Sequence, residues 1–312
     1  MTFLHIHHLQ VYFKSADGMV KAADGVDLEL KAGETLALVG ETGSGKTVLG
    51  LAITRLLPKT AVVRGDIWYR GQDLLALSQD EMRRIRGREI AMILQNPLSS
   101  LNPALTIGEQ IAEALQEHRG LKKKEAWQKA GEILERTGIP TQRARNYAHE
   151  FSGGMRQRVM IAIGLACEPA LLIADEPTKG LDVTIQAQIV ALMYAVTKGI
   201  SPPRSMLLIT HDLGVAAELA DRLAVMYAGK IVECGRTREI FKNPRHPYTR
   251  GLLDAHPSNG LKAIGGFSPS LINLPPGCSF HPRCKQARDR CSNACPPMKK
   301  IAEDWEVRCF YA

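Results

Sequence analysis

The sequence predicts an α/β fold with a mostly parallel sheet, and three observations support this prediction. Short apolar segments typical of buried strands alternate with amphipathic segments typical of helices in residues 36–96 and 152–221. A glycine-rich loop joins one such strand to the helix that follows it, at residues 40–47. The 312 residues are 45% hydrophobic but only 5% aromatic, which is typical of a core built from aliphatic side chains.

The order of the predicted elements divides the chain into a core and a tail. Strand-like alternation over residues 2–39 predicts an antiparallel β region before the first parallel strands. Residues 98–150 predict an inserted helical lobe, with one helix near Ile107 and a second over 122–137. A hairpin over 222–235 ends the core. Proline and cysteine then become frequent, so we predict a core domain of residues 1–235 and a loop-rich C-terminal region of residues 236–312.

The glycine-rich loop has the spacing G-x-x-x-x-G-K-[ST] between Gly40 and Thr47. Glycines allow successive backbone N–H groups to face one anion, and the start of a helix adds partial positive charge. Lys46 is placed to reach the β- and γ-phosphates of a nucleotide, and the Thr47 hydroxyl is placed to bind Mg²⁺. A chance glycine turn is the alternative, but the strand before the loop and the helix after it favour phosphate binding.

Two acidic residues, Asp175 and Glu176, follow the apolar segment 171–174. At the end of a buried strand, an aspartate can hold Mg²⁺ and the next glutamate can act as a general base on water. An exposed acidic turn is the alternative interpretation. Together with the phosphate loop, the pair indicates a nucleotide hydrolase.

A second glycine-containing segment, Phe151 to Gln157, stands at the start of a predicted helix. Ser152 suits the N-cap, and Gly153-Gly154 permits close approach of the backbone to an anion. This run resembles the L-S-G-G-Q signature of ATP-binding cassette (ABC) ATPases. Phe151 replaces the usual leucine, and Met155 replaces the usual glutamine.

Further segments resemble the motifs of ABC ATPases and come in the same order. Gln95 resembles the Q-loop glutamine, Asp182 belongs to a D-loop, and His211 resembles the switch histidine. Phe13 aligns with the aromatic residue that stacks on adenine, with Tyr12 as the second choice. The resemblance implies an ABC-type P-loop ATPase fold and assigns ATP binding to Phe13, Gly40, Glu41, Thr42, Gly43, Ser44, Gly45, Lys46, Thr47, Val48 and Gln95.

The same resemblance implies a mechanism that needs two ATPase subunits. Glu176, His211 and Lys46 are the implied catalytic residues, and Thr47, Gln95 and Asp175 the implied Mg²⁺ site. The signature residues Ser152, Gly153, Gly154 and Met155 would act on the ATP of the neighbouring subunit, next to Asp182. Closure on ATP and reopening after hydrolysis would drive a membrane partner.

The C-terminal region resembles the ATPase subunits of dipeptide, oligopeptide and nickel importers. The resemblance rests on residues 243–249, on Pro276-Gly277-Cys278 and on Pro282-Arg283-Cys284. It implies peptide import as the function, with import of nickel or another small solute as the alternative. The implied partners are a second, related ATPase in a heterodimer, two transmembrane permease subunits and, indirectly, an external solute-binding protein. The implied location is peripheral, on the cytoplasmic face of the inner membrane.

Five cysteines lie within the last part of the chain, between Cys278 and Cys309. Thiolates favour zinc or iron–sulfur clusters, and the spacing alone leaves zinc, a cluster and free thiols open. The importer resemblance implies a [4Fe–4S] cluster on Cys278, Cys284, Cys291 and Cys309, with Cys295 left over. Cys167 and Cys234 lie in apolar runs and are predicted to be core thiols.

Composition separates the remaining function classes only weakly. A net charge of +8 is compatible with nucleic acid, anionic lipid or nucleotides, but no long Lys/Arg block predicts nucleic-acid binding. The N-terminus does not resemble a signal peptide, and no segment is apolar enough for a membrane span. The alternatives from other classes are a soluble ABC ATPase acting on DNA or in iron–sulfur assembly, and a translation regulator. The short helical insertion and the single phosphate loop disfavour them.

Overall fold

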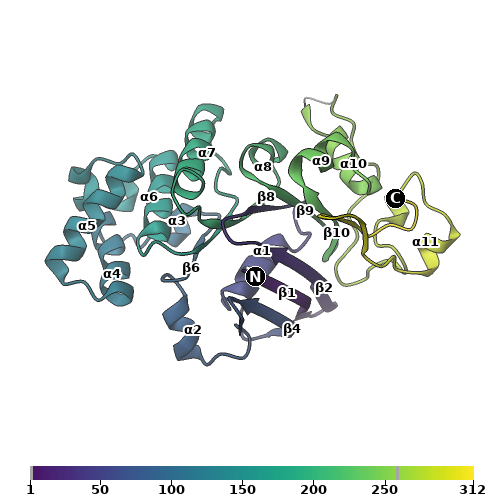
Figure 1. Ribbon diagram of the computed structural model, residues 1–312, viewed down its shortest axis with the longest axis horizontal. Coiled ribbons are helices and arrows are strands. Elements are labelled where there is room, and N and C mark those ends of the chain that lie inside the picture. Colours follow the sequence, from purple (N-terminus) through teal and green to yellow (C-terminus); the bar gives the residue numbers. More distant parts are fainter. Residues whose placement is uncertain (1–2, 258–259) are drawn as a thin grey trace. The chain divides into compact units, whose positions relative to one another are not determined.

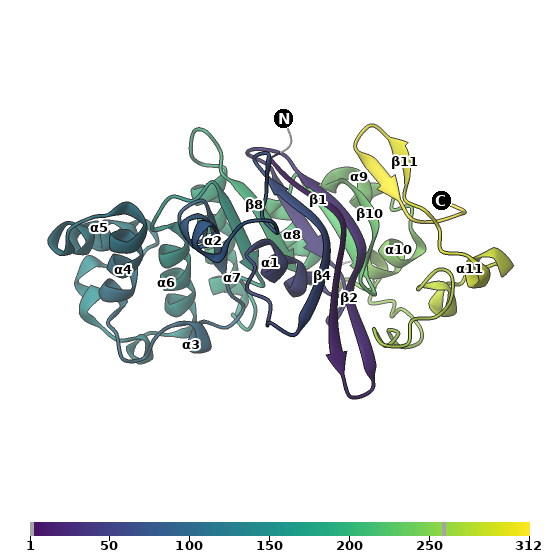
Figure 2. The ribbon, with the colours of Figure 1, turned by 90° about the horizontal axis from the view of Figure 1, so that it is seen from below.

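The structure, a computed structural model, describes residues 3–257 and 260–312. The chain divides into two units, whose helices and strands are labelled in Figures 1 and 2. Unit 1 combines Met1–Ala76 with Leu208–Ala312, and unit 2 comprises Leu77–Leu207. In the described part of the chain, no helix is both long enough and apolar enough to cross a membrane.

Unit 1 begins with an antiparallel sheet of four strands in the order β2-β1-β4-β5. Leu4 and Ile6 are buried, and so are Leu9 and Val11 after a register shift in β1, because successive side chains of a strand point to opposite faces. The predicted antiparallel β region is therefore confirmed. The strands are β1 (Leu4–Ser15), β2 (Gly18–Leu30), β4 (Ala61–Tyr69) and β5 (Gln72–Asp73).

The second sheet of unit 1 has the order β11-β12-β10-β9-β3-β8. β3 pairs in parallel with β9, and its five residues are all buried, as expected for a strand covered on both faces. β12 pairs with β10, so a hairpin from the C-terminal region extends this sheet (Figure 2, yellow). The strands are β3 (Thr35–Val39), β8 (Ser205–Thr210), β9 (Arg222–Tyr227), β10 (Lys230–Arg236), β11 (Lys299–Ala302) and β12 (Trp305–Val307), and only the last three residues of β8 belong to unit 1.

Short helices complete unit 1. α10 starts with Pro247 in its first turn, where the missing N–H costs nothing, and the His246 ring accepts a hydrogen bond from the Tyr248 N–H at 3.1 Å. The predicted loop-rich C-terminal region therefore also holds three α-helices. The helices are α1 (Lys46–Ile53), α8 (Leu213–Leu219), α9 (Thr237–Lys242), α10 (Pro247–Asp254), the 3₁₀ helix η4 (His281–Arg283) and α11 (Asp289–Asn293).

Unit 2 contains two parallel strands and the predicted helical insertion. β6 pairs with β7 in the register Ile90↔Leu171. α4 begins with a capping box between Thr106 and Glu109, and Gly120 ends it in a left-handed conformation. The elements are α2 (Gln79–Ile85), β6 (Ile90–Ile93), α3 (Pro97–Ser100), α4 (Ile107–Arg119), α5 (Lys123–Arg136), η1 (Thr141–Arg145), η2 (Ala148–Glu150), α6 (Gly153–Leu165), β7 (Leu171–Asp175) and α7 (Val183–Thr197).

Helix α6 organises unit 2 because it packs against α3, α4, α5 and α7. Arg158 on α6 donates one hydrogen bond to the Thr137 carbonyl at the end of α5 and another to Gln188 on α7. The guanidinium group therefore links three helices. The segment 151–155, which precedes and begins α6, has its place in unit 2 fixed by these contacts.

Candidate functional site

The phosphate loop in unit 1 is packed so closely that two of its glycines cannot be replaced. Gly40 and Gly45 have φ angles of 152° and 107°. A Cβ atom at Gly40 would lie 2.1 Å from the Met226 carbonyl oxygen, and one at Gly45 would lie 1.9 Å from that of Ala22. Both neighbours are backbone atoms of adjacent strands and cannot move aside. The loop conformation therefore follows from β2 of the first sheet and β9 of the second sheet, which lie against it.

Lys46 is turned back onto its own loop. Its side chain is buried, and Nζ donates hydrogen bonds to the carbonyl oxygens of Gly40 at 2.7 Å and Glu41 at 2.9 Å. Ser44 is also buried, and its hydroxyl oxygen has no hydrogen-bond partner within the described residues. Thr47 is exposed. The loop thus combines a buried cation with polar groups that an anion can engage.

Two further predicted residues lie in unit 1. His211 directly follows β8 and is exposed, and Asp212 caps the next helix by accepting hydrogen bonds from the N–H groups of Gly214 and Val215. Phe13 lies near the end of β1 and is half-buried. The neighbouring Tyr12 hydroxyl donates to Asp24 at 2.5 Å, and burial together with this carboxylate raises the pKa of Tyr12 to about 12. The assignment of Phe13 to adenine stacking stays a prediction.

Unit 2 holds the acidic pair at the end of β7. Asp175 is 1% exposed and Glu176 is 8% exposed. Glu176 has a φ angle of 49°, a left-handed conformation that costs free energy for a residue with a side chain. Such strain indicates that the surrounding structure fixes the direction in which this carboxylate leaves the backbone.

The signature-like segment of unit 2 forms a capped helix start. The Ser152 hydroxyl accepts a hydrogen bond from the Met155 N–H at 3.4 Å. A Cβ atom at Gly154 would lie 2.5 Å from Ile185 on α7, so glycine permits the close packing of these helices. Asp182 caps α7 by accepting from the Ile185 N–H. Gln95 is half-buried in the link between β6 and α3.

The C-terminal cysteines in unit 1 gather at one pocket. Cys278, Cys284, Cys291 and Cys309 all line it, whereas Cys295 does not. Burial is the main cause that raises the pKa of Cys278 to about 11; a backbone hydrogen bond opposes it, and the neighbouring cysteines add to it. Over residues 3–257 and 260–312, however, no three His, Cys, Asp or Glu side chains are placed to hold one metal ion. This geometry does not by itself support the predicted cluster.

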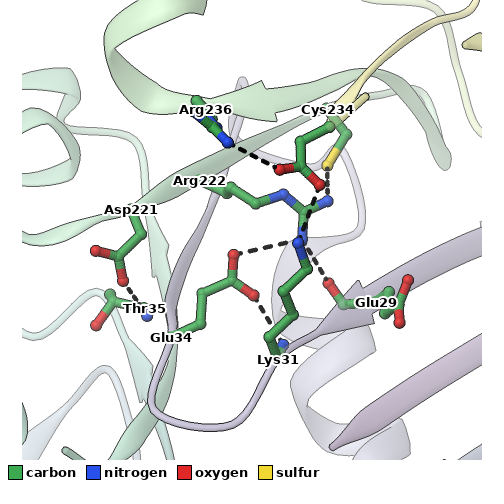
Figure 3. A network of polar contacts seen from close by, with 9 residues as sticks. Glu29, Lys31, Glu34, Thr35, Asp221, Arg222, Cys234 and Arg236 are labelled. Carbon is green, nitrogen blue, oxygen red and sulfur yellow. Dashed lines mark hydrogen bonds and ion pairs between the residues drawn. The ribbon is translucent and has the colours of Figure 1, made fainter. Parts of the chain in front are cut away.

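A polar network ties the C-terminal hairpin to the start of unit 1 (Figure 3). Arg222 donates hydrogen bonds to the Glu29 carbonyl and to the carboxylate of Glu34. Asp304, between β11 and β12, accepts from Lys31 at 2.9 Å and from Arg236 at 3.3 Å. Cys234 lies beside Arg222 and is buried, as predicted, and burial raises its pKa to about 11. Cys167 is likewise buried.

Comparison with protein families gives two matches that follow one another along the chain. Residues 23–179 match the "ABC transporter" family, and residues 232–291 match "Oligopeptide/dipeptide transporter, C-terminal region". The chain belongs to the ABC transporter family.

Similar ABC transporter proteins cover nearly the whole chain. The oligopeptide transport ATP-binding protein OppD of Bacillus subtilis is 50% identical over 98% of this chain and 87% of its own length. OppD of Salmonella typhimurium is 44% identical over 98% and 93%. Among solved structures, a dimeric bacterial ABC transporter cassette has a TM-score of 0.68 and 26% identity, and covers 75% of this chain and 99% of its own.

Sequence reasoning missed the residues of the C-terminal region that contact the phosphate loop. Arg283 and Ser268 contact the side chain of Glu41, and Tyr248 contacts its backbone N–H. The tripeptide Pro282-Arg283-Cys284 marked this segment, but only as part of the resemblance to importer ATPases. No local signal connects residues that are 242 positions apart.

Proposed function

We propose that this chain is the ATP-hydrolysing subunit of an importer for oligopeptides or dipeptides. The main support is the match of residues 232–291 to the C-terminal region of such transporters. This match follows the ABC transporter match of residues 23–179 along the chain. Relatives whose names specify oligopeptide or dipeptide transport cover 98% or more of the chain. The proposed location is the cytoplasmic face of the inner membrane, and nickel or another small solute is the alternative cargo.

ATP is the substrate, and ATP and Mg²⁺ are expected for any ABC ATPase. Residues 40–48 would hold the phosphates through backbone N–H groups, with Lys46 leaving its two carbonyl partners to bind them. Thr47, Gln95 and Asp175 offer oxygen ligands of the kind that Mg²⁺ prefers. Mg²⁺, when bound, neutralises charge on the phosphates during hydrolysis. Phe13 would stack on the adenine ring.

The remaining roles follow from proton chemistry and charge. Glu176 would accept a proton from the attacking water, and its left-handed backbone conformation sets the direction in which its side chain leaves the chain. His211 would donate a hydrogen bond to the γ-phosphate. Ser152, Gly153, Gly154 and Met155, together with Asp182, would complete the site of a neighbouring subunit, because a capped helix start attracts anions.

The proposed assembly contains two ATPases. The similar solved cassette is a dimer in two structures, and one of them is bound to ADP and Pi. For this chain we propose a heterodimer with a second ABC ATPase, docked on two transmembrane permeases that receive peptide from an external binding protein. No nucleic acid enters this assembly.

We also propose a [4Fe–4S] cluster on Cys278, Cys284, Cys291 and Cys309. The support is that all four thiols line one pocket in a region that otherwise has few long helices. A four-iron cluster holds its thiolates farther apart than a single ion does, so a shared pocket is the relevant feature. A bound cluster would cross-link the loops of this region.

The function is tested by Glu176→Gln in the assembled importer, with Glu218→Gln as the matched control because Glu218 is exposed on α8. We expect Glu176→Gln to bind ATP and to lose both hydrolysis and peptide uptake by about a hundredfold or more, a typical loss for a general base. The control should keep both activities. Normal hydrolysis by Glu176→Gln would exclude Glu176 as the base, and uptake of nickel complexes but not peptides would reassign the cargo.

The cluster is tested by iron and sulfide assays on anaerobically purified protein. Cys284→Ala should lose the iron, and Cys295→Ala should keep it, because Cys295 lies outside the pocket lined by the other four thiols. An iron-free, colourless wild-type protein, or one that holds zinc instead, would contradict the proposal.

A further inference from the structure

Glu41, the second residue of the phosphate loop, is bound by an ion pair and hydrogen bonds to residues of the C-terminal region. Arg283 forms a two-point ion pair with it, Nη1 to Oε2 at 2.9 Å and Nη2 to Oε1 at 3.0 Å. The Ser268 hydroxyl donates to the same carboxylate. The Glu41 backbone N–H donates to the Tyr248 hydroxyl at 2.9 Å. Both the side chain and the backbone of one loop residue are therefore fixed from a segment more than 200 positions away in the sequence.

Arg283, which binds the Glu41 carboxylate, is itself held in place by its neighbours. The Arg283 side chain is only 7% exposed, and its Nε donates to the Gly265 carbonyl at 3.0 Å. Its guanidinium lies 5.8 Å from the centre of the Tyr227 ring and 6.0 Å from that of Phe280. Arginine keeps its charge and its planar donor geometry in such surroundings. The ion pair is therefore pre-organised from the Arg283 side.

Tyr248 is equally fixed. It is fully buried, and its ring centre lies 4.5 Å from that of Tyr227 and 5.4 Å from that of Phe280. A buried hydroxyl needs a hydrogen-bond partner, and here the Glu41 N–H provides it. The aromatic cluster thus supports both contacts to the loop.

The contacts to Glu41 affect a carbonyl oxygen that accepts a hydrogen bond from Lys46. Lys46 Nζ donates to the carbonyl oxygens of Gly40 and Glu41, so the position of Glu41 determines where one partner of the lysine lies. A nucleotide phosphate competes with those same carbonyls for the lysine. A change in the conformation at Glu41 would alter that competition without removing any group that touches the phosphates.

We infer that Arg283 is a positioning residue for MgATP binding: through Glu41 it holds the phosphate loop in the conformation that binds the nucleotide. Tyr248 assists through the loop backbone. The inference rests on the proposed function of residues 40–48. It makes the C-terminal region a part of the nucleotide site in addition to any role of its cysteines.

The test compares Arg283→Gln and Arg283→Lys with the control Lys31→Gln. The control removes the exposed ion pair between Lys31 and Asp304, which also joins the C-terminal region to the rest of unit 1. Binding of a fluorescent ATP analogue with Mg²⁺, and kcat and KM in the assembled importer, are measured for each. We expect Arg283→Gln to raise Kd and KM about tenfold, the usual effect of losing a charged hydrogen-bonded pair, with kcat within about twofold. Arg283→Lys should recover part of the loss, and Lys31→Gln should behave as wild type.

A double variant shows whether Arg283 acts through Glu41. Glu41→Gln should weaken binding as Arg283→Gln does, and the two changes together should cost no more than one, because the same contact is lost. Additive losses, or unchanged Kd and KM in Arg283→Gln, would overturn the inference.

Two controls separate other causes. A merely structural role would lower the active fraction and the thermal midpoint while leaving Kd of the folded protein unchanged, and this result would also overturn the inference. Equal iron content in wild type and Arg283→Gln would show that the cysteine region is intact in the variant, so a raised Kd with equal iron supports the inference and a raised Kd with lost iron counts against it. Failure of the wild type to bind MgATP would instead refute the proposed function.

Discussion

Among the described residues, two ion pairs join the C-terminal region to the rest of unit 1, and they have similar chemistry but different surroundings. Arg283 binds Glu41 with two hydrogen bonds and is 7% exposed. Lys31 binds Asp304 through a single contact at 2.9 Å, and its side chain is 52% exposed. Water and ions screen the second pair far more than the first, and a flexible lysine loses more freedom when it is held. Location and burial, rather than the presence of opposite charges, therefore decide how much an ion pair contributes to stability.

The largest effect is expected at a third, fully buried attachment, which extends this comparison. Glu233 on β10 accepts hydrogen bonds from the backbone N–H groups of Arg245 and His246 and from the indole N–H of Trp305, each at 2.9 Å. Glu233→Ala would leave two buried donors and one part-buried donor without an acceptor, and we expect it to lower the free energy of unfolding by about 3 kcal/mol.

Urea unfolding of the isolated subunit measures this change. Glu306→Ala is the matched control, because Glu306 is exposed on the neighbouring strand β12 and should change stability by about 0.5 kcal/mol at most. Equal losses from both substitutions would show that burial does not govern the strength of these attachments.

The next effect is a difference between the two ion pairs themselves. A double-mutant cycle with Arg283→Gln and Glu41→Gln should give a coupling free energy of about 1.5 kcal/mol, since the pair is two-point and largely shielded from water. The cycle with Lys31→Gln and Asp304→Asn should give less than about 0.5 kcal/mol. Urea unfolding of the four variants of each cycle provides the values. Similar coupling free energies for the two pairs would contradict the claim that burial makes the Arg283–Glu41 pair stronger.

The pH dependence of the Arg283–Glu41 pair gives a smaller effect. Burial alone would raise the pKa of Glu41, but hydrogen bonds from Arg283 and Ser268 and the charge of Arg283 bring it below its ordinary value of 4.5. A carboxyl group whose pKa is lowered on folding stabilises the protein above the ordinary value and loses this contribution as the pH falls through the lowered value. The stability difference between wild type and Arg283→Gln should therefore stay constant from about pH 8 to about pH 6 and shrink below about pH 4.

Unfolding titrations at several pH values test this expectation. A difference that already changes between about pH 8 and about pH 6 would point to a group other than Glu41, because carboxyl groups with lowered pKa values are ionised throughout that range.

The sequence predicted what depends on local pattern. The strand 36–39, the loop 40–47 and the helix after it were recognised because apolar periodicity and glycine spacing lie within about twenty residues. The hairpin over 222–235 was also predicted, as were the buried thiols Cys167 and Cys234 from their apolar runs, and the structure confirms them.

The parts that sequence reasoning missed depend on distant contacts. β11 is exposed along its whole length and has no alternation of apolar and polar residues, so nothing in its sequence indicated a strand that extends the sheet. Arg283 lies 242 positions from Glu41, and a single arginine in a cysteine-rich segment carries no sign of its partner. Such contacts become visible only when the fold brings the segments together.

The smallest effect concerns the exposed pair and completes the comparison. Lys31→Gln should lower the free energy of unfolding by less than about 0.5 kcal/mol at low salt, and this difference should vanish when the salt concentration rises from about 0.05 M to about 0.5 M. Asp304 keeps Arg236 as a second cation, which further limits the loss. The stability loss in Arg283→Gln should change little over the same salt range, because the Arg283 side chain is hardly reached by solvent. Urea unfolding at both salt concentrations measures the two differences. If the Arg283 contribution also vanished at high salt, solvent would be screening both attachments alike, and the shielding that distinguishes the pair at the phosphate loop would not exist.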